Sequence, residues 1–252
     1  MTAFAATPTS ASAQAHRMVP EIDIPVLALT GVVAFGWILG DELAPPHCAP
    51  ECDRSTVNGL DRGAAGNWSG GWSTVGDVGV ATMLGVPAIV LLAAEGPVPM
   101  LSDAVVIGQA VALSQALAVI SNMSTRRPRP FVYGTDAPLD ERMRGRASLS
   151  FFSGHTAASF AAAVATWRTL LRLHPRSPWP WVALGVGLVG ASVVGMARVL
   201  GGHHFPTDVM AGALTGMAMG WLIPELHGER VRIAPLVVGP SRGVGVVLDV
   251  QP

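Results

Sequence analysis

The chain alternates long apolar runs with short polar segments, and this pattern predicts a bundle of membrane-spanning helices. Six runs approach the roughly 20 apolar residues that a helix needs to cross a bilayer. They cover residues 24–40, about 79–94, 101–123, 151–173, 181–200 and 207–226. Trp72, Trp179, Trp181 and Trp221 lie near the ends of these runs, where membrane proteins place aromatic side chains. We therefore expect an all-α, polytopic membrane protein with a six-helix transmembrane bundle over residues 21–226.

The segments around the bundle are more polar. Residues 1–20 are rich in Ala, Ser and Thr and have neither a basic start nor a long apolar run, which favours a flexible tail over a signal peptide. Residues 41–78 form the longest loop between runs. At the C-terminal end, residues 227–252 form a tail in which two short apolar runs flank a Gly-Pro-Ser-Arg-Gly turn, a pattern compatible with a short hairpin.

Composition agrees with a membrane protein. Apolar residues make up 50% of the 252, charged residues only 13%, and the mean hydropathy is +0.45. Soluble domains carry roughly 25% charged residues. The net charge of −1 gives no electrostatic basis for a nucleic-acid partner. All 16 basic residues are Arg, so neither a Schiff-base lysine nor a P-loop lysine is present.

The distribution of Arg between the runs bears on orientation. With the N-terminus inside, Arg17, Arg172, Arg176 and the C-terminal arginines are cytoplasmic, as the positive-inside rule favours. The outside loop over residues 124–150, however, holds six arginines. Either the topology is inverted, or these arginines hold anions, and the motifs described next favour the second interpretation.

Cys48 and Cys52 lie in the first long loop with three residues between them. In an oxidising compartment they are a candidate disulfide. Free thiols and a metal site with His47 are the alternatives, although two thiols and one His are too few for a closed zinc site.

Three polar clusters lie at the ends of apolar runs, and the predicted topology brings them to one side of the membrane. The clusters are residues 126–130 (Arg-Arg-Pro-Arg-Pro), residues 153–155 (Ser-Gly-His), and the set Arg198, His204 and Asp208. Charged groups beside hydrocarbon are costly, so their convergence indicates a functional site. Taken singly, each has a structural alternative: a lipid-headgroup patch, a helix cap, and a structural hydrogen bond.

Together the clusters suit phosphoryl transfer. Guanidinium groups match phosphate oxygens, and the backbone at Ser153 and Gly154 opens a helix whose free N–H groups favour an anion. A carboxylate at Asp208 is placed to orient the His204 imidazole as a nucleophile, and His155 from another helix is placed to protonate the departing oxygen.

These motifs resemble those of the type 2 phosphatidic acid phosphatase (PAP2) family, which read K-x6-R-P, P-S-G-H and S-R-x5-H-x3-D. Arg129-Pro130 matches the end of the first motif, and Ser153-Gly154-His155 matches the second. Arg198, His204 and Asp208 match the third with its internal spacing. The resemblance spans about residues 121–220.

The resemblance implies roles for these residues. His204 would be the nucleophile, Asp208 its orienter and His155 the general acid. The remaining matches would stabilise the five-coordinate phosphorus; they are Arg129, Arg198, Ser153 and the Gly154 amide. The family needs no metal, and we expect none here, nor any other cofactor.

Three positions depart from the family pattern. Asn122 stands where the first motif has Lys, Phe152 where the second has Pro, and Ala197 where the third has Ser. Asn122 can donate a hydrogen bond to phosphate but supplies no charge. We therefore include Asn122 among the candidate phosphate ligands, with the hypothesis that Arg126 or Arg127 compensates for the missing cation.

The sequence thus predicts a metal-independent lipid phosphatase of the inner membrane, with its site facing the periplasm or cell exterior. Its substrate would be a lipid phosphomonoester or diphosphate, such as phosphatidic acid or an isoprenoid diphosphate, attacked through a phosphohistidine. Transfer to a second lipid is not separated from hydrolysis. The alternative is a non-catalytic membrane protein that binds phospholipid or transports a solute and retains a degenerate site. Oligomeric state is open.

Overall fold

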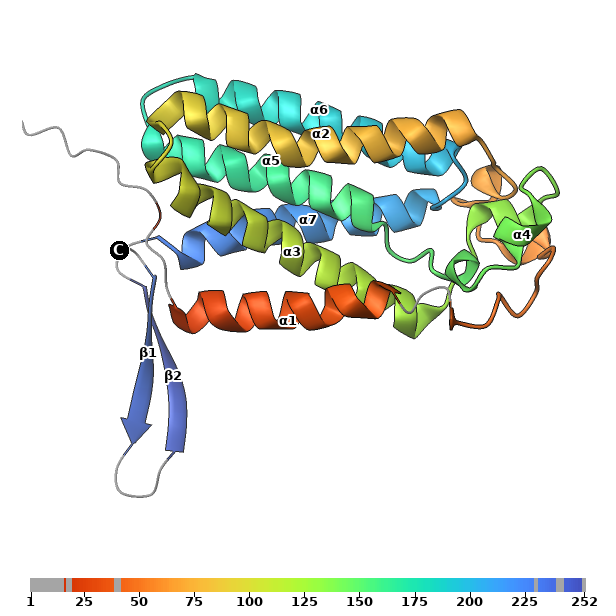
Figure 1. The fold of residues 1–252 in the computed structure, drawn as a ribbon, viewed down its shortest axis with the longest axis horizontal. Coiled ribbons are helices and arrows are strands. Elements are labelled where there is room, and N and C mark those ends of the chain that lie inside the picture. Colours follow the sequence, from red (N-terminus) through yellow and green to blue (C-terminus); the bar gives the residue numbers. More distant parts are fainter. Residues whose placement is uncertain (1–15, 17–19, 39–41, 229–230, 239–242, 251–252) are drawn as a thin grey trace, which may run out of the picture.

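The computed structural model describes residues 16, 20–38, 42–228, 231–238 and 243–250 (Figure 1). Apart from His16 and Pro20, the tail expected over residues 1–20 lies outside the described residues. Within them the chain is mainly helical. The helices are α1 (Pro20–Ile38), α2 (Gly70–Glu95), α3 (Pro99–Thr125), α4 (Leu139–Arg142), α5 (Gly154–Leu173), α6 (Trp179–Leu200) and α7 (Pro206–Leu226).

All of these helices except the short α4 run side by side along the long axis of the molecule (Figure 1). Among the described residues, α2, α3, α6 and α7 are long and apolar enough to cross a membrane. Large apolar side chains such as Ile89 of α2, Val186 of α6 and Leu214 of α7 are exposed on their outer faces. The chain is therefore an all-α integral membrane protein. In the part of the chain that the structure describes, four helices meet the length and hydropathy requirement, so the expected number of six is not confirmed.

Helix α5 forms the centre of the bundle and packs against α2, α3, α6 and α7. Its inner positions are mostly Ala, and Ala157, Ala158 and Ala161 are completely buried. Because α5 is rich in Ala and carries two Arg near its end, its composition is less apolar than that of the lipid-facing helices. Its place inside the bundle explains how it runs through the membrane region without a strongly apolar surface.

Glycines on α7 allow the closest helix contact in the bundle. Gly212, Gly216 and Gly220 recur every four residues and therefore share one face of α7. A Cβ on Gly212 would lie 2.5 Å from the Ser153 carbonyl oxygen, and one on Gly216 would collide with the carbonyl of Ala157. Small residues at such positions let membrane helices approach backbone to backbone.

Local signals account for the helix boundaries. The Ser69 side chain caps α2 by accepting a hydrogen bond from the Trp72 N–H, so α2 begins nine residues before the predicted start at residue 79. The first loop consequently ends at Ser69 instead of residue 78. Helix α3 ends at Thr125, and the next residue, its C-cap Arg126, adopts a left-handed conformation (φ 47°).

The remaining segments lie at the two ends of the bundle. Residues 42–69 and 126–153 lie at one end, together with 3-10 helices at Arg54–Thr56, Arg62–Ala64, Pro130–Tyr133 and Gly145–Ser148 (Figure 1). At the other end, strands β1 (Val231–Val238) and β2 (Gly243–Val250) form an antiparallel hairpin in which Val231 pairs with Val250 and Val238 with Gly243.

Candidate active site

The three motif clusters meet at the end of the bundle that carries the long loops. Arg129 follows α3, His155 lies in the first turn of α5, and Arg198 lies near the end of α6. His204 lies in the turn between α6 and α7, and Asp208 in the first turn of α7. Figure 1 shows these helix ends on the same side of the molecule.

His204 is buried, with 4% of its surface exposed, and its ring is held by the backbone. Nδ1 lies 2.6 Å from the carbonyl oxygen of Ser150. A carbonyl only accepts hydrogen bonds, so Nδ1 carries the proton and Nε2 keeps its lone pair. Burial, and then the charges of Arg129 and Arg198, lower the pKa of His204 well below its ordinary value, which leaves the imidazole neutral and nucleophilic.

Asp208 is completely buried and does not bond to His204 among the described hydrogen bonds. Its Oδ2 accepts from the Ser150 hydroxyl at 2.5 Å and from the Phe205 N–H at 2.8 Å. Its Oδ1 accepts from Nη1 of Arg127 at 2.5 Å. The direct Asp208–His204 pair expected from the sequence is thus replaced by an indirect one, in which Ser150 bonds to Asp208 through its hydroxyl and to His204 through its carbonyl.

Arg129 is held by two bonds. Its Nε donates to the Leu149 carbonyl at 3.2 Å, and its Nη1 lies 3.1 Å from Nδ1 of His203. His203 in turn contacts the Ser73 hydroxyl through Nε2 at 2.8 Å. Burial, followed by the charges of Arg129 and Arg198, lowers the pKa of His203 to about 2, so this ring is neutral and accepts from Arg129. His203 was not among the predicted site residues, although it directly precedes the motif residue His204.

His155 and Arg198 share a partner that lies outside the motifs. Oδ1 of Asp77, from α2, accepts from Nη1 of Arg198 at 2.9 Å and lies 3.1 Å from Nε2 of His155. Asp77 is the single acidic residue between positions 62 and 94. An isolated carboxylate beside an apolar run is the signal by which the sequence could have indicated it.

The second motif has a structural role in addition to any contact with substrate. Ser153 is the N-cap of α5, and its hydroxyl lies 2.8 Å from Oγ1 of Thr156. A Cβ on Gly154 would lie 2.5 Å from Oε1 of Gln115 in α3. A side chain here would displace the end of Gln115, so glycine leaves room for Gln115 and keeps the α5 N-terminus free of a side chain at that position.

The residues expected to replace the missing Lys have other partners. The Asn122 amide nitrogen donates to the carbonyls of Ala118 and Phe152, at 2.8 and 3.1 Å. Arg126 donates to the Ala44 carbonyl through Nη2 at 2.6 Å. Arg127 bridges two carboxylates, Asp208 through Nη1 and Asp61 through Nη2 at 2.7 Å. In this arrangement the donors of Asn122 and the two terminal nitrogens of Arg127 are directed at the protein itself.

Residues 42–69 pack over this end of the bundle. A disulfide joins Cys48 and Cys52, with their Cα atoms 4.9 Å apart. The Cys52 N–H donates to the Val132 carbonyl at 2.9 Å. Asp61 accepts from the backbone N–H and the hydroxyl of Thr207, at 3.0 and 2.6 Å, and thereby satisfies a free amide at the start of α7. Asp61 was not among the predicted site residues.

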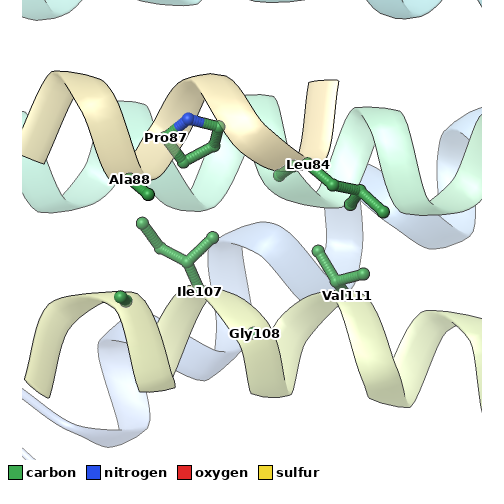
Figure 2. Close-up of a pocket in the computed structure, with 8 residues that line it drawn as sticks. Leu84, Pro87, Ala88, Ile107, Gly108 and Val111 are labelled. Atoms are coloured by element: carbon green, nitrogen blue, oxygen red, sulfur yellow. The ribbon is translucent and has the colours of Figure 1, made fainter. Parts of the chain in front are cut away.

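An apolar cavity lies deeper in the bundle, between α2, α3 and α5. Its volume is about 180 Å³, and Figure 2 shows Pro87 and Ala88 of α2 facing Ile107 and Val111 of α3 across it. Leu84, at its near edge, follows Asp77 by seven residues, or about 10 Å along the helix.

The family is established by comparison with known proteins. The profile of the PAP2 superfamily matches residues 103–232, about half of the chain, including all three motifs. The chain belongs to the PAP2 superfamily. The resemblance stated from the motifs is thus confirmed.

Curated relatives match shorter segments. A lipid A 1-phosphatase from Porphyromonas gingivalis is 38% identical over 81 residues, which are 32% of this chain and 17% of that protein. The undecaprenyl-diphosphatase BcrC from Bacillus subtilis is 32% identical over 95 residues, which are 38% of this chain and 42% of that protein. This PAP2 chain therefore aligns with less than half of the length of either relative.

One solved structure also matches this chain. The crystal structure of a transmembrane PAP2-type phosphatidylglycerolphosphate phosphatase from Bacillus subtilis matches with a TM-score of 0.47 and 17% sequence identity. The match covers 81% of this chain and 94% of that one.

Proposed function

We propose that this PAP2 chain is a lipid phosphatase that works through a phosphohistidine, without a metal ion. The observation that carries the proposal is the buried His204, whose Nδ1 is fixed by the Ser150 carbonyl and whose pKa is lowered by burial and by the charges of Arg129 and Arg198. A phosphate-binding protein needs the arginines, but it has no use for a neutral imidazole with an oriented lone pair.

The reaction follows from these positions. Nε2 of His204 attacks phosphorus as the bond from phosphorus to the lipid oxygen breaks, and His155 gives its proton to that oxygen. Arg129 and Arg198 stabilise the charge on the equatorial oxygens. Water then attacks the phosphohistidine, His155 takes a proton from it, and inorganic phosphate and the free His204 result.

A lipid substrate is supported by two observations. The relatives named above act on lipid phosphates, according to their names. In addition, Ala162 in the lining of the apolar cavity follows His155 by seven residues of α5, or about 10 Å along the helix, which is within the length of an acyl chain. We propose that the site faces the periplasm or cell exterior across an inner membrane, which places the Cys48–Cys52 disulfide in an oxidising compartment.

The test is phosphate release in detergent, with EDTA present, from a panel of lipid phosphates and diphosphates. Wild type is compared with His204→Ala and with His174→Ala, a matched control in an exposed histidine at the opposite end of α5. We expect release by wild type and His174→Ala and none by His204→Ala. Quenching in alkaline denaturant should trap a phosphoryl group on wild type that is stable to alkali and lost on acid treatment. Folded wild type that binds these lipids without releasing phosphate would favour the non-catalytic alternative, which the uncharged Asn122 supports.

A further inference from the structure

Asp77 places a negative charge next to the proposed general acid. It lies in α2, outside the residues that match the family profile. Its side chain is 61% exposed, yet its Oδ1 is held between Nη1 of Arg198 and Nε2 of His155, at 2.9 and 3.1 Å.

The contact between Asp77 and His155 indicates on which side of the site the leaving group would lie. A carboxylate oxygen only accepts hydrogen bonds, so Nε2 of His155 carries a proton toward Asp77. That N–H is the one available to a leaving oxygen in the proposed reaction. Oδ1 of Asp77 thus accepts from the same N–H that the leaving oxygen would use. Because the Asp77 side chain is exposed, it can rotate away from Nε2 of His155 when substrate binds and still lie near the leaving group.

The cations around this position are few. Arg198 donates to Asp77 itself, Arg129 lies 3.1 Å from Nδ1 of His203, and Arg127 is paired with Asp61 and Asp208. Asn122 removes one positive charge relative to the family pattern, and Asp77 adds a negative one beside His155. The site is therefore less positive than the motifs alone imply.

Leaving groups respond differently to this charge. A phosphomonoester loses an alcohol oxygen, which is neutral once His155 has protonated it. A diphosphate attacked at its terminal phosphorus releases the lipid monophosphate, which keeps negative charge after His155 has protonated it. Like charges about 5 Å apart slow a reaction by about fourfold at the dielectric constant of water and by roughly 300-fold at that of a protein surface, so we expect an effect of about tenfold from the exposed Asp77.

We propose that Asp77 determines specificity, directing this phosphatase toward lipid phosphomonoesters and against lipid diphosphates. The inference rests on the proposed function. Family membership does not decide the matter, because the matched relatives include both a 1-phosphatase and a diphosphatase by name.

The test uses two substrates with the same tail, farnesyl phosphate and farnesyl diphosphate. Initial rates of phosphate release in detergent give kcat/KM for wild type, Asp77→Asn and Asp77→Glu. We expect wild type to prefer the monophosphate by about tenfold or more, Asp77→Asn to reduce that ratio by about tenfold, and Asp77→Glu to retain it. The ratio of the two kcat/KM values is compared because a variant that only misplaces His155 would lower both values equally and leave their ratio unchanged.

The possible failures are distinct. An unchanged ratio in Asp77→Asn, or a wild-type preference for the diphosphate, would overturn the role of Asp77 while the phosphatase activity stood. No release from either substrate by folded wild type would overturn the proposed function, and this inference with it.

Discussion

Ser150 joins Asp208 to His204 through two different groups. Its hydroxyl donates to Oδ2 of Asp208 at 2.5 Å, and its carbonyl accepts from Nδ1 of His204 at 2.6 Å. The carboxylate thus orients the nucleophile of the proposed reaction through a serine of the loop before α5. This relationship makes Ser150 a positioning residue.

Replacement of Ser150 by Ala should therefore reduce turnover. Without the hydroxyl, Asp208 no longer restrains the Ser150 carbonyl, and we expect kcat to fall by about tenfold with KM little changed. Steady-state rates on a lipid phosphate measure the effect. Ser148→Ala is the matched control, because Ser148 is equally buried but bonds to the Gly145 carbonyl. Wild-type kcat in Ser150→Ala would contradict the indirect arrangement.

Arg127 should contribute to stability more than to phosphate binding. It pairs with the buried carboxylates of Asp61 and Asp208, and loss of one partner from such a network costs about 3 kcal/mol. We expect Arg127→Ala to lower the thermal midpoint of unfolding in detergent by several degrees, with turnover lost in parallel. Arg126→Ala removes an exposed hydrogen bond to the Ala44 carbonyl and should leave the thermal midpoint and the turnover unchanged. A wild-type midpoint with a raised KM in Arg127→Ala would instead support the compensation hypothesis.

The lowered pKa of Asp61 predicts that the folded protein becomes less stable in acid. Burial alone raises its pKa, but hydrogen bonds from Thr207 and Arg127 outweigh burial, and the pKa lies below the ordinary value of 3.8. A lowered folded-state pKa contributes stability above the unfolded pKa and loses it as the pH falls through the folded pKa. We expect the midpoint of wild type to decrease below about pH 4, and that of Asp61→Asn to decrease less. If the midpoints of wild type and Asp61→Asn fell in parallel with pH, Asp61 would not contribute to the loss of stability in acid.

The close contact between α5 and α7 predicts that replacement of Gly216 by Ala destabilises the protein, whereas replacement of Gly85 does not. A Cβ at Gly216 would collide with the Ala157 carbonyl, whereas a Cβ at Gly85 of α2 has no atom within 4 Å. Gly216→Ala should destabilise the protein by about 1–3 kcal/mol, and Gly85→Ala should be neutral or slightly stabilising. Thermal unfolding of the two variants tests this, and equal midpoints would argue against the close approach of α5 and α7.

The sequence by itself determined the class of fold and the family. Apolar runs of membrane length predicted the all-α membrane protein, and the spacing of Arg198, His204 and Asp208 identified the PAP2 motifs. Both depend on local information, because hydropathy and helical spacing are properties of short segments. Span boundaries were less accurate, as the nine-residue extension of α2 by its Ser69 cap illustrates.

Only the tertiary structure decided the partners within the site. Asp77 lies 78 residues from His155 in the sequence, and Asp61 lies 146 residues from Thr207. Asp208 bonds to Ser150 instead of His204, although His204 is four residues away along the chain. Such pairings depend on how helix ends and loops meet in space, and a buried charge bonds to whichever donors the packing brings to it.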